Sequence, residues 1–178
     1  MELLAKVWDL LGGNATEIIA LCALFFTAYQ THATRRHNIL SVQPHLTTFV
    51  NRDRNQKTGT LSVALMNNGL GPARILSYRI YLDGKEINAD VSKDAEAVIK
   101  QMLGERQYTY RLTTLGNDYA MSTNESKDIL LVQFSLNKES DFEEVERQLN
   151  RFDLVVNYDS MYGKHFIYDS RMNGRSHR

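Results

Sequence analysis

An uninterrupted run of apolar residues is the most marked feature of the hydrophobic pattern, and it covers residues 18–29. A run of about a dozen residues is shorter than the roughly 20 residues of helix that the hydrocarbon core of a bilayer requires. Extension over residues 15–33 adds mainly Ala, Thr, Gln and His, with a single charge, Glu17, near one end. We therefore expect a transmembrane helix with a basic flank over residues 14–37. The side chains expected inside the membrane are Ile18, Ile19, Leu21, Leu24, Phe25 and Phe26.

Two other interpretations of this run stay open. One is a secretory signal peptide, although the residues before the run lack a positive segment, and Arg35-Arg36 follows where a cleavage site of small residues belongs. The other is a buried core helix, because Phe25, Phe26 and Tyr29 suit a protein interior equally well.

The residues on either side of the run predict how it is placed. Residues 1–13 carry apolar side chains at helical spacing opposite Glu2, Lys6 and Asp9, which predicts an amphipathic helix at the membrane interface. Because Arg35-Arg36 follows the run and the N-terminal flank is net acidic, the positive-inside rule places the C-terminal part in the cytoplasm. The sole cysteine, Cys22, excludes an intrachain disulfide framework.

After residue 37 the pattern changes to short segments that alternate with period two, which is typical of β-strands. We expect strands over residues 40–50 with an interruption at Pro44, and over 60–66, 73–82, 107–112, 128–136, 152–158 and 164–168. A tight turn at Asp83-Gly84 leads into residues 85–87. Helical spacing predicts helices over residues 92–103 and 140–149.

These elements predict a mainly β fold, an antiparallel β-sandwich or small barrel of about seven strands with two short helices, preceded by the transmembrane helix. The β domain is expected over residues 38–170, and residues 171–178 are expected to form a flexible tail.

Composition and motifs argue against several classes of function. Lys and Arg balance Asp and Glu at 21 each, so no overall positive charge favours DNA or RNA as a partner. The five histidines form no HExxH motif, and one cysteine cannot supply a thiolate metal cluster. We expect no metal site, no cofactor and no enzymatic activity.

One loop carries the candidate ligand-binding residues Asn68, Gly69, Gly71 and Arg74. Its glycines fit an ordinary turn, but backbone amides beside an arginine also fit an anion-binding nest for a phosphate group. Tyr158 and Tyr162 are candidates for stacking on a nucleotide base, although tyrosine is also an ordinary strand residue that packs at a core or its rim.

Two segments carry a resemblance to known proteins. The stretch LSVALMNNGLGPARILSYRIYLDGKEI, residues 61–87, resembles the strand, loop and strand units of bacterial immunoglobulin-like β-sandwich domains, and residues 152–170 look like their terminal hairpin. The whole layout is similar to the membrane effectors of bacterial antiphage signalling systems, in which a β-barrel senses a cyclic nucleotide and membrane segments disrupt the inner membrane.

This resemblance implies an effector of antiphage defence in the bacterial inner membrane, with a cytoplasmic β domain that senses a small anionic ligand such as a cyclic nucleotide. Its expected partners are the lipid bilayer, the nucleotide and further copies of itself, since it would act by oligomerising and perturbing the membrane. The alternative is a passive membrane-tethered adaptor whose β-sandwich binds a protein partner through an exposed edge strand.

Overall fold

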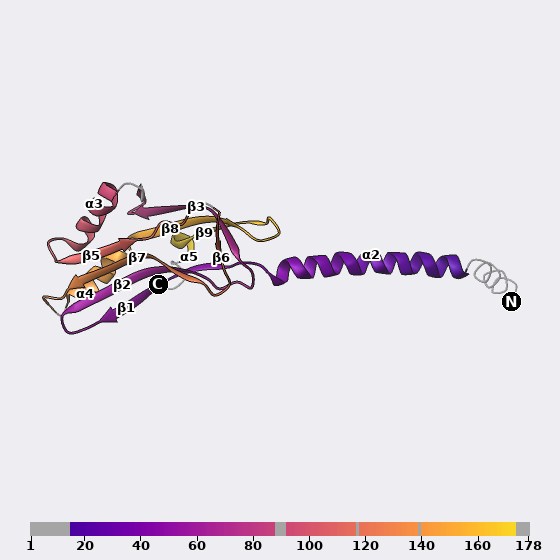
Figure 1. Ribbon diagram of the computed structural model, residues 1–178, viewed down its shortest axis with the longest axis horizontal. Coiled ribbons are helices and arrows are strands. Elements are labelled where there is room, and N and C mark those ends of the chain that lie inside the picture. The colour runs from indigo at the N-terminus through magenta and orange to yellow at the C-terminus, as the bar shows by residue number, and fades with distance from the viewer. Residues whose placement is uncertain (1–14, 88–91, 117, 139, 174–178) are drawn as a thin grey trace. The chain divides into compact units, whose positions relative to one another are not determined.

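The computed structural model describes residues 15–87, 92–116, 118–138 and 140–173 (Figure 1). The chain divides into two compact units, Met1–Ser41 and Val42–Arg178. The amphipathic helix expected over residues 1–13 lies outside the described residues. The elements in order are α2 (Ala15–Ser41), β1 (Leu46–Arg54), β2 (Thr58–Asn67), β3 (Ala73–Leu82), β4 (Lys85–Ile87), α3 (Ser92–Leu103), β5 (Tyr108–Leu112), β6 (Tyr119–Met121), β7 (Ser126–Ser135), α4 (Asp141–Leu149), β8 (Phe152–Asp159), β9 (His165–Asp169) and α5 (Ser170–Asn173).

The first unit contains a helix of 27 residues, α2, where the apolar run predicts one. None of its residues is buried, so the structure gives no support to the interpretation of this run as a core helix. Among the described residues, no helix, α2 included, combines the length and the apolar character that crossing a membrane requires. The helix also ends at Ser41, four residues beyond the expected boundary at residue 37. Leu40 is therefore helical, and the expectation of a strand starting there is wrong.

The second unit consists mainly of two antiparallel sheets. The first sheet has the strand order β1-β2-β7-β5, and the second has the order β4-β3-β8-β9, with β6 pairing β3 as well. The mainly β, antiparallel fold is confirmed, with nine strands among the described residues where about seven were expected. Expected strand boundaries agree closely with β3, which runs from Ala73 to Leu82, and the hairpin turn at Asp83-Gly84 is present.

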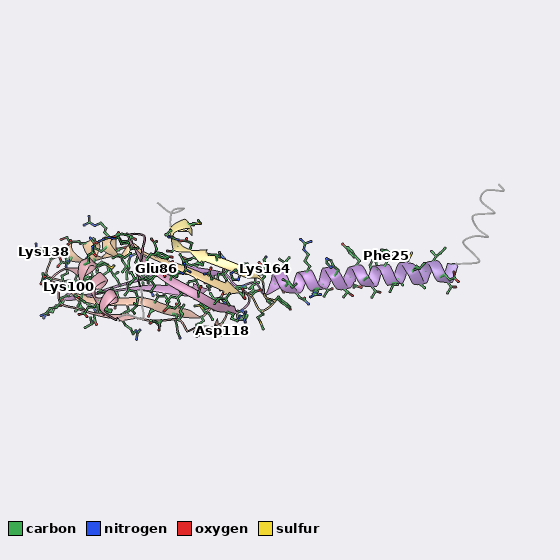
Figure 2. The ribbon with its side chains drawn as sticks, turned by 90° about the horizontal axis from the view of Figure 1, so that it is seen from above. Phe25, Glu86, Lys100, Asp118, Lys138 and Lys164 are labelled. Carbon is green, nitrogen blue, oxygen red and sulfur yellow. The ribbon has the colours of Figure 1, made fainter. Side chains whose placement is uncertain are left out.

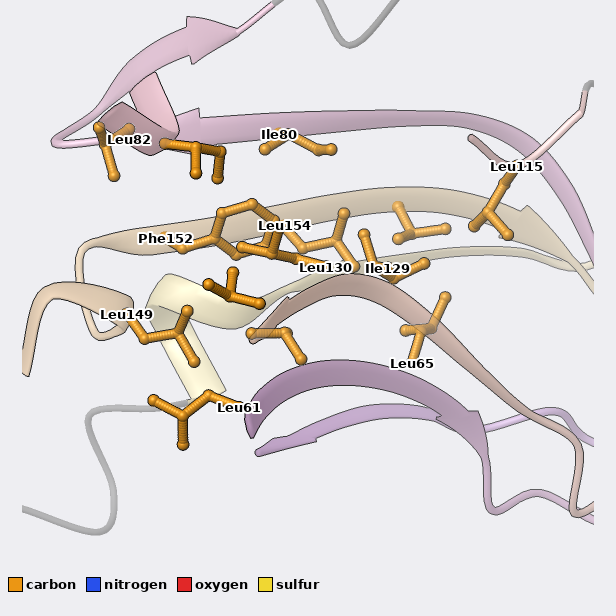
Figure 3. Close-up of a cluster of buried hydrophobic side chains, with 14 of the residues drawn as sticks. Leu61, Leu65, Ile80, Leu82, Leu115, Ile129, Leu130, Leu149, Phe152 and Leu154 are labelled. Carbon is orange, nitrogen blue, oxygen red and sulfur yellow. The ribbon is translucent and has the colours of Figure 1, made fainter. Parts of the chain in front are cut away.

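Alternating side chains of the two sheets form one hydrophobic core (Figure 3). Leu61 of β2 is in register with Val132 of β7, and Ile80 of β3 with Leu154 of β8, and these four side chains are almost fully buried. The expected apolar faces of the two helices add to this core. Their buried residues are Ile99, Met102 and Leu103 of α3 and Phe142, Val145 and Leu149 of α4.

The structure corrects the expectation for both ends of the β domain. The domain begins at Val42 rather than at residue 38, and β1 starts only at Leu46, after a connection that contains Pro44. At the other end, Arg171 belongs to α5 and not to a tail. The rest of the expected tail, residues 174–178, lies outside the described residues.

Candidate functional site

The expected ligand-binding residues lie at one end of the β domain, which we call the loop end. It carries the β2–β3 connection, residues 68–72, and the β8–β9 turn, residues 160–164. Arg74, at the start of β3, is in register with Asp159, at the end of β8, so the two connections lie at the same end of the second sheet. Figure 2 shows Asp118 and Lys164 at this end of the domain, and Lys100 and Lys138 at the opposite end.

The centre of the loop end is Asn67, the last residue of β2, whose side chain is fully buried. Its Oδ1 atom accepts hydrogen bonds from the backbone N–H groups of His45, at 3.1 Å, and Gly69, at 3.0 Å. Its Nδ2 atom donates to the carbonyl oxygens of Gly71, at 2.9 Å, and Met121, at 3.2 Å. One amide group thus ties together the connection before β1, the β2–β3 connection and the end of β6.

The role of Asn67 escaped the sequence analysis, which placed it in a loop. A signal was present, because Leu61, Val63 and Leu65 predict a buried face with period two and Asn67 is the next position on that face. A polar side chain at a core-facing position needs hydrogen-bond partners, and Asn67 has them.

Three backbone amides of the expected anion nest, those of Asn68, Gly69 and Leu70, are already bonded within the chain. The N–H group of Asn68 donates to the carbonyl of His45 at 2.8 Å, and that of Leu70 to the carbonyl of Gln43 at 3.0 Å. The N–H group of Gly69 donates to Asn67 Oδ1. An anion would have to displace these bonds, so the geometry adds no support for a phosphate site here.

The two glycines of this connection allow the chain segment before β1 to pass close by. A Cβ atom on Gly71 would lie 2.0 Å from the carbonyl oxygen of Val42, and one on Gly69 would lie 2.3 Å from the backbone nitrogen of His45. Asn68 is exposed, and its Nδ2 atom donates to Thr47 Oγ1 at 2.7 Å. The residues predicted to bind an anion therefore hold Val42 and its neighbours against the β domain.

Arg74 lies beside an acidic partner. Its Nη2 atom is 2.9 Å from Asp159 Oδ2, and Nδ1 of His165 is 2.6 Å from Asp159 Oδ1. The hydrogen bond from Arg74, followed by the one with His165, holds the pKa of the Asp159 carboxyl below its ordinary value. The same pairing raises the pKa of Arg74. The arginine charge is thus balanced locally, whereas a nucleotide phosphate would need it free.

The two candidate tyrosines differ in their surroundings. Tyr158 is 4% exposed and stacks on Phe166 with ring centroids 5.4 Å apart. Burial raises the pKa of its hydroxyl. Tyr162, in the β8–β9 turn, is 55% exposed. Tyr158 is therefore a core residue, and only Tyr162 offers its ring to a ligand.

A cavity of about 370 Å³ lies elsewhere, between the β3–β4 hairpin and α3. Its lining includes Asp83, Lys85 and Glu86, so both signs of charge face it. Asp83 is hydrogen-bonded by Arg151, with the Nε–Oδ1 distance at 2.8 Å. None of the expected ligand-binding residues lines this cavity. Over the residues that the structure describes, no group of three or more His, Cys, Asp or Glu side chains is placed to hold a metal ion.

Replacing Asp159 tests the charged cluster of the loop end. We expect Asp159→Asn to lower the midpoint of thermal unfolding by a few degrees at neutral pH, because Arg74 loses its ionic partner and His165 loses a hydrogen-bonded carboxylate. The pKa of Asp159 is depressed in the folded state, so its contribution is complete above the unfolded pKa, about 3.9, and is lost as the pH falls through the folded value. Calorimetry between pH 7 and about 2.5 should show the two proteins converging in acid. A difference that is constant over this range would contradict the assignment.

The protein is a small β domain with an N-terminal helical extension. The β domain has two antiparallel sheets around one core, and the long helix before it has no buried residue. The chain belongs to the family described as Domain of unknown function (DUF8453), whose model matches residues 8–174. No curated protein matches the sequence. The matched range covers all of α2 and reaches α5, so the helix and the β domain are parts of one family unit.

Proposed function

We propose that this protein is a membrane-attached binding module, in which α2 inserts into a lipid bilayer and the β domain binds a protein partner. The observation that carries the proposal is the exposure of the apolar run. Ile19, Leu24 and Phe25 are 67%, 66% and 79% exposed, and Phe26 is 68% exposed. Figure 2 shows the Phe25 side chain on α2. Water-exposed apolar side chains of this size and number are costly, so the helix requires an apolar environment.

The arrangement of these side chains favours lipid over a single protein groove. At 100° per residue, Ile19, Leu24 and Phe25 point in well-separated directions around the helix axis. A helix that is apolar on most sides fits surroundings that are apolar on most sides. The run of residues 18–29 is roughly 18 Å long at 1.5 Å per residue, which suffices for deep insertion. Insertion is all that the proposal requires.

The basic pair that follows the run supports the side of attachment. Arg35 and Arg36 lie on α2 just beyond the apolar segment, where guanidinium groups meet lipid phosphates. We place the protein at the bacterial inner membrane with the β domain in the cytoplasm, because the anionic cytoplasmic leaflet attracts basic residues beside an inserted segment. Self-association of the membrane-bound protein stays a prediction of the effector interpretation.

For the partner, β9 is the best-suited edge strand. It ends the second sheet, and Ile167 on it is 66% exposed. The opposing edge of the first sheet, β1, is partly covered, because Arg52 and Arg54 pair with Glu146 and Glu143 of α4. An extended segment of a partner that adds to β9 would gain main-chain hydrogen bonds and contact with Ile167.

The nucleotide-gated effector stays a prediction without a structural observation in its favour, since the amides of Asn68, Gly69 and Leu70 and the Arg74 side chain already have partners. Its test is thermal unfolding of the full chain in mild detergent against a panel of cyclic di- and trinucleotides. A ligand at about 100 times its Kd should add about 2.7 kcal/mol to the free energy of unfolding, which is a shift of several degrees.

Flotation with lipid vesicles tests the attachment. We expect the full chain to float with phosphatidylcholine vesicles, and the double variant Phe25→Glu, Phe26→Glu to stay in the dense fraction. Each acidic residue placed at membrane depth costs about 2 kcal/mol or more, so the two together should weaken binding by at least about 100-fold. Met172→Glu is the control for an added charge at an exposed apolar position, because Met172 is 78% exposed on α5, outside the helix that inserts. Flotation of the double variant at the parent level would refute the proposal.

A further inference from the structure

The loop end of the β domain carries its own exposed apolar side chains. Leu70, in the β2–β3 connection, is 72% exposed. Met161 and Tyr162, in the β8–β9 turn, are 73% and 55% exposed. These three residues come from two separate connections that the pairing of Arg74 with Asp159 brings to the same end.

The opposite end of the domain differs in composition. Its described turns carry polar, charged or glycine residues: Asn55-Gln56-Lys57, Asp83-Gly84, Gly104-Glu105-Arg106, Asn137-Lys138 and Asn150-Arg151. Large apolar side chains are therefore exposed in turns at the loop end and not in the described turns at the opposite end. Such a local concentration marks an interaction surface.

The chain connects the loop end directly to the helix that we propose to insert into lipid. Val42 follows Ser41, the last residue of α2, without an intervening linker. The carbonyl oxygen of Val42 lies against Gly71, and Gln43 accepts a hydrogen bond from the N–H group of Leu70. Gln43, which contacts Leu70, is thus only two positions along the chain from Ser41, the last residue of α2.

We propose that the loop end inserts Leu70, Met161 and Tyr162 into the interfacial layer of the same bilayer that receives α2. This inference rests on the proposed function and adds a second contact with the membrane. Tyrosine and aliphatic side chains are typical of such contacts, with the tyrosine ring at the level of the lipid headgroups.

The charges around these residues indicate which lipid is needed. Arg74 is paired with Asp159 and also lies near Asp118, and Lys164 stands 5.1 Å from the ring centroid of Phe166. Positive and negative groups are both present, so attraction to anionic lipids is not the main force. The contact is apolar and should form on neutral phosphatidylcholine.

A dye at the loop end tests this contact in the full chain. A Met161→Cys variant in a Cys22→Ala background, labelled with an environment-sensitive fluorophore, should show emission at shorter wavelength when vesicles are added, and lipids brominated near the headgroup should quench it. The matched control is Lys138→Cys in the same background, which places the dye at the opposite end (Figure 2). Its emission should not change.

Substitution supplies an independent measurement. Leu70→Glu, Met161→Glu and Tyr162→Glu together should weaken vesicle binding by about ten-fold, since three exposed apolar contacts are lost. Gln56→Glu with Lys138→Glu lowers the net charge by the same amount at the other end and should leave binding unchanged.

The outcomes separate the two proposals. If the protein floats with vesicles but the dye stays in a watery environment, the loop-end contact is wrong and the attachment through α2 stands. If the protein does not float, the attachment itself fails. A blue shift that needs no vesicles and grows with protein concentration would assign the surface to a second copy of the chain and overturn the lipid contact.

Discussion

Asn67→Asp should destabilise the β domain by about 4 kcal/mol or more, although it replaces a single NH₂ group by an oxygen. The parent amide donates from Nδ2 to the carbonyl oxygens of Gly71, Met121 and Ser122, at 2.9, 3.2 and 3.3 Å. A carboxylate has no hydrogen to donate and would face these oxygens with a negative charge at a site that is 0% exposed. Denaturant unfolding followed by circular dichroism measures the loss.

The neighbouring asparagine provides the matched control. Asn68 is exposed, and its Nδ2 atom contacts a hydroxyl, Thr47 Oγ1, that can donate as well as accept. Asn68→Asp should therefore change the free energy of unfolding by less than about 0.5 kcal/mol. Equal effects of the two substitutions would show that the Asn67 amide does not tie the loop end together.

Gly71→Ala is the second substitution with a large expected effect, about 3 kcal/mol of lost stability. The new methyl group would lie 2.0 Å from the carbonyl oxygen and 2.7 Å from the carbonyl carbon of Val42, and backbone atoms cannot rotate away as a side chain does. Relief requires Val42 to move from its place against the β2–β3 connection. Thermal unfolding and protease digestion at residues 42–45 should both show the change.

Gly116→Ala is the control for the general effect of removing a glycine. A Cβ atom at Gly116 meets no atom within 4 Å. Stability should change by less than about 0.5 kcal/mol there, or rise slightly because the unfolded chain loses freedom. A Gly71 variant as stable as the Gly116 variant would contradict the close approach of Val42.

Much of the fold follows from local pattern, and the errors have physical causes. The strand Ala73–Leu82 and the turn after it were predictable because alternation and turn residues are local signals. The second half of β1 was not predictable from local pattern. Its residues Arg52 and Arg54 contact Glu146 and Glu143, which are about 90 residues distant in sequence. Three-residue β6 forms only because it pairs with the start of β3.

The candidate site was less predictable than the fold. Gly69 and Gly71 predicted either an ordinary turn or an anion-binding nest, and the structure places the chain segment Val42–His45 against them. A glycine permits close approach of any group, and the sequence around it does not say which group approaches. The pairing of Arg74 with Asp159 likewise depends on the register between β3 and β8.

The most direct measurement of the central claim, insertion of α2 into lipid, uses the sole cysteine of the chain. Cys22 is exposed and lies within the apolar run. Thiols react with maleimides as thiolates, and a low-dielectric environment suppresses the thiolate. On vesicles, a membrane-impermeant maleimide should modify Cys22 at least about ten times more slowly than it modifies the Met172→Cys variant in a Cys22→Ala background. Met172 is a suitable reference because it is 78% exposed on α5.

Slow modification of Cys22 could come from surrounding lipid or from contacts between α2 helices of neighbouring copies. Dilution of the protein in lipid distinguishes the two. If lipid surrounds α2, slow modification of Cys22 persists when the lipid-to-protein ratio is raised 100-fold, roughly the range over which weak helix bundles dissociate. Equal rates at the two positions on vesicle-bound protein, or protection that disappears on dilution, would contradict insertion of α2 into the bilayer.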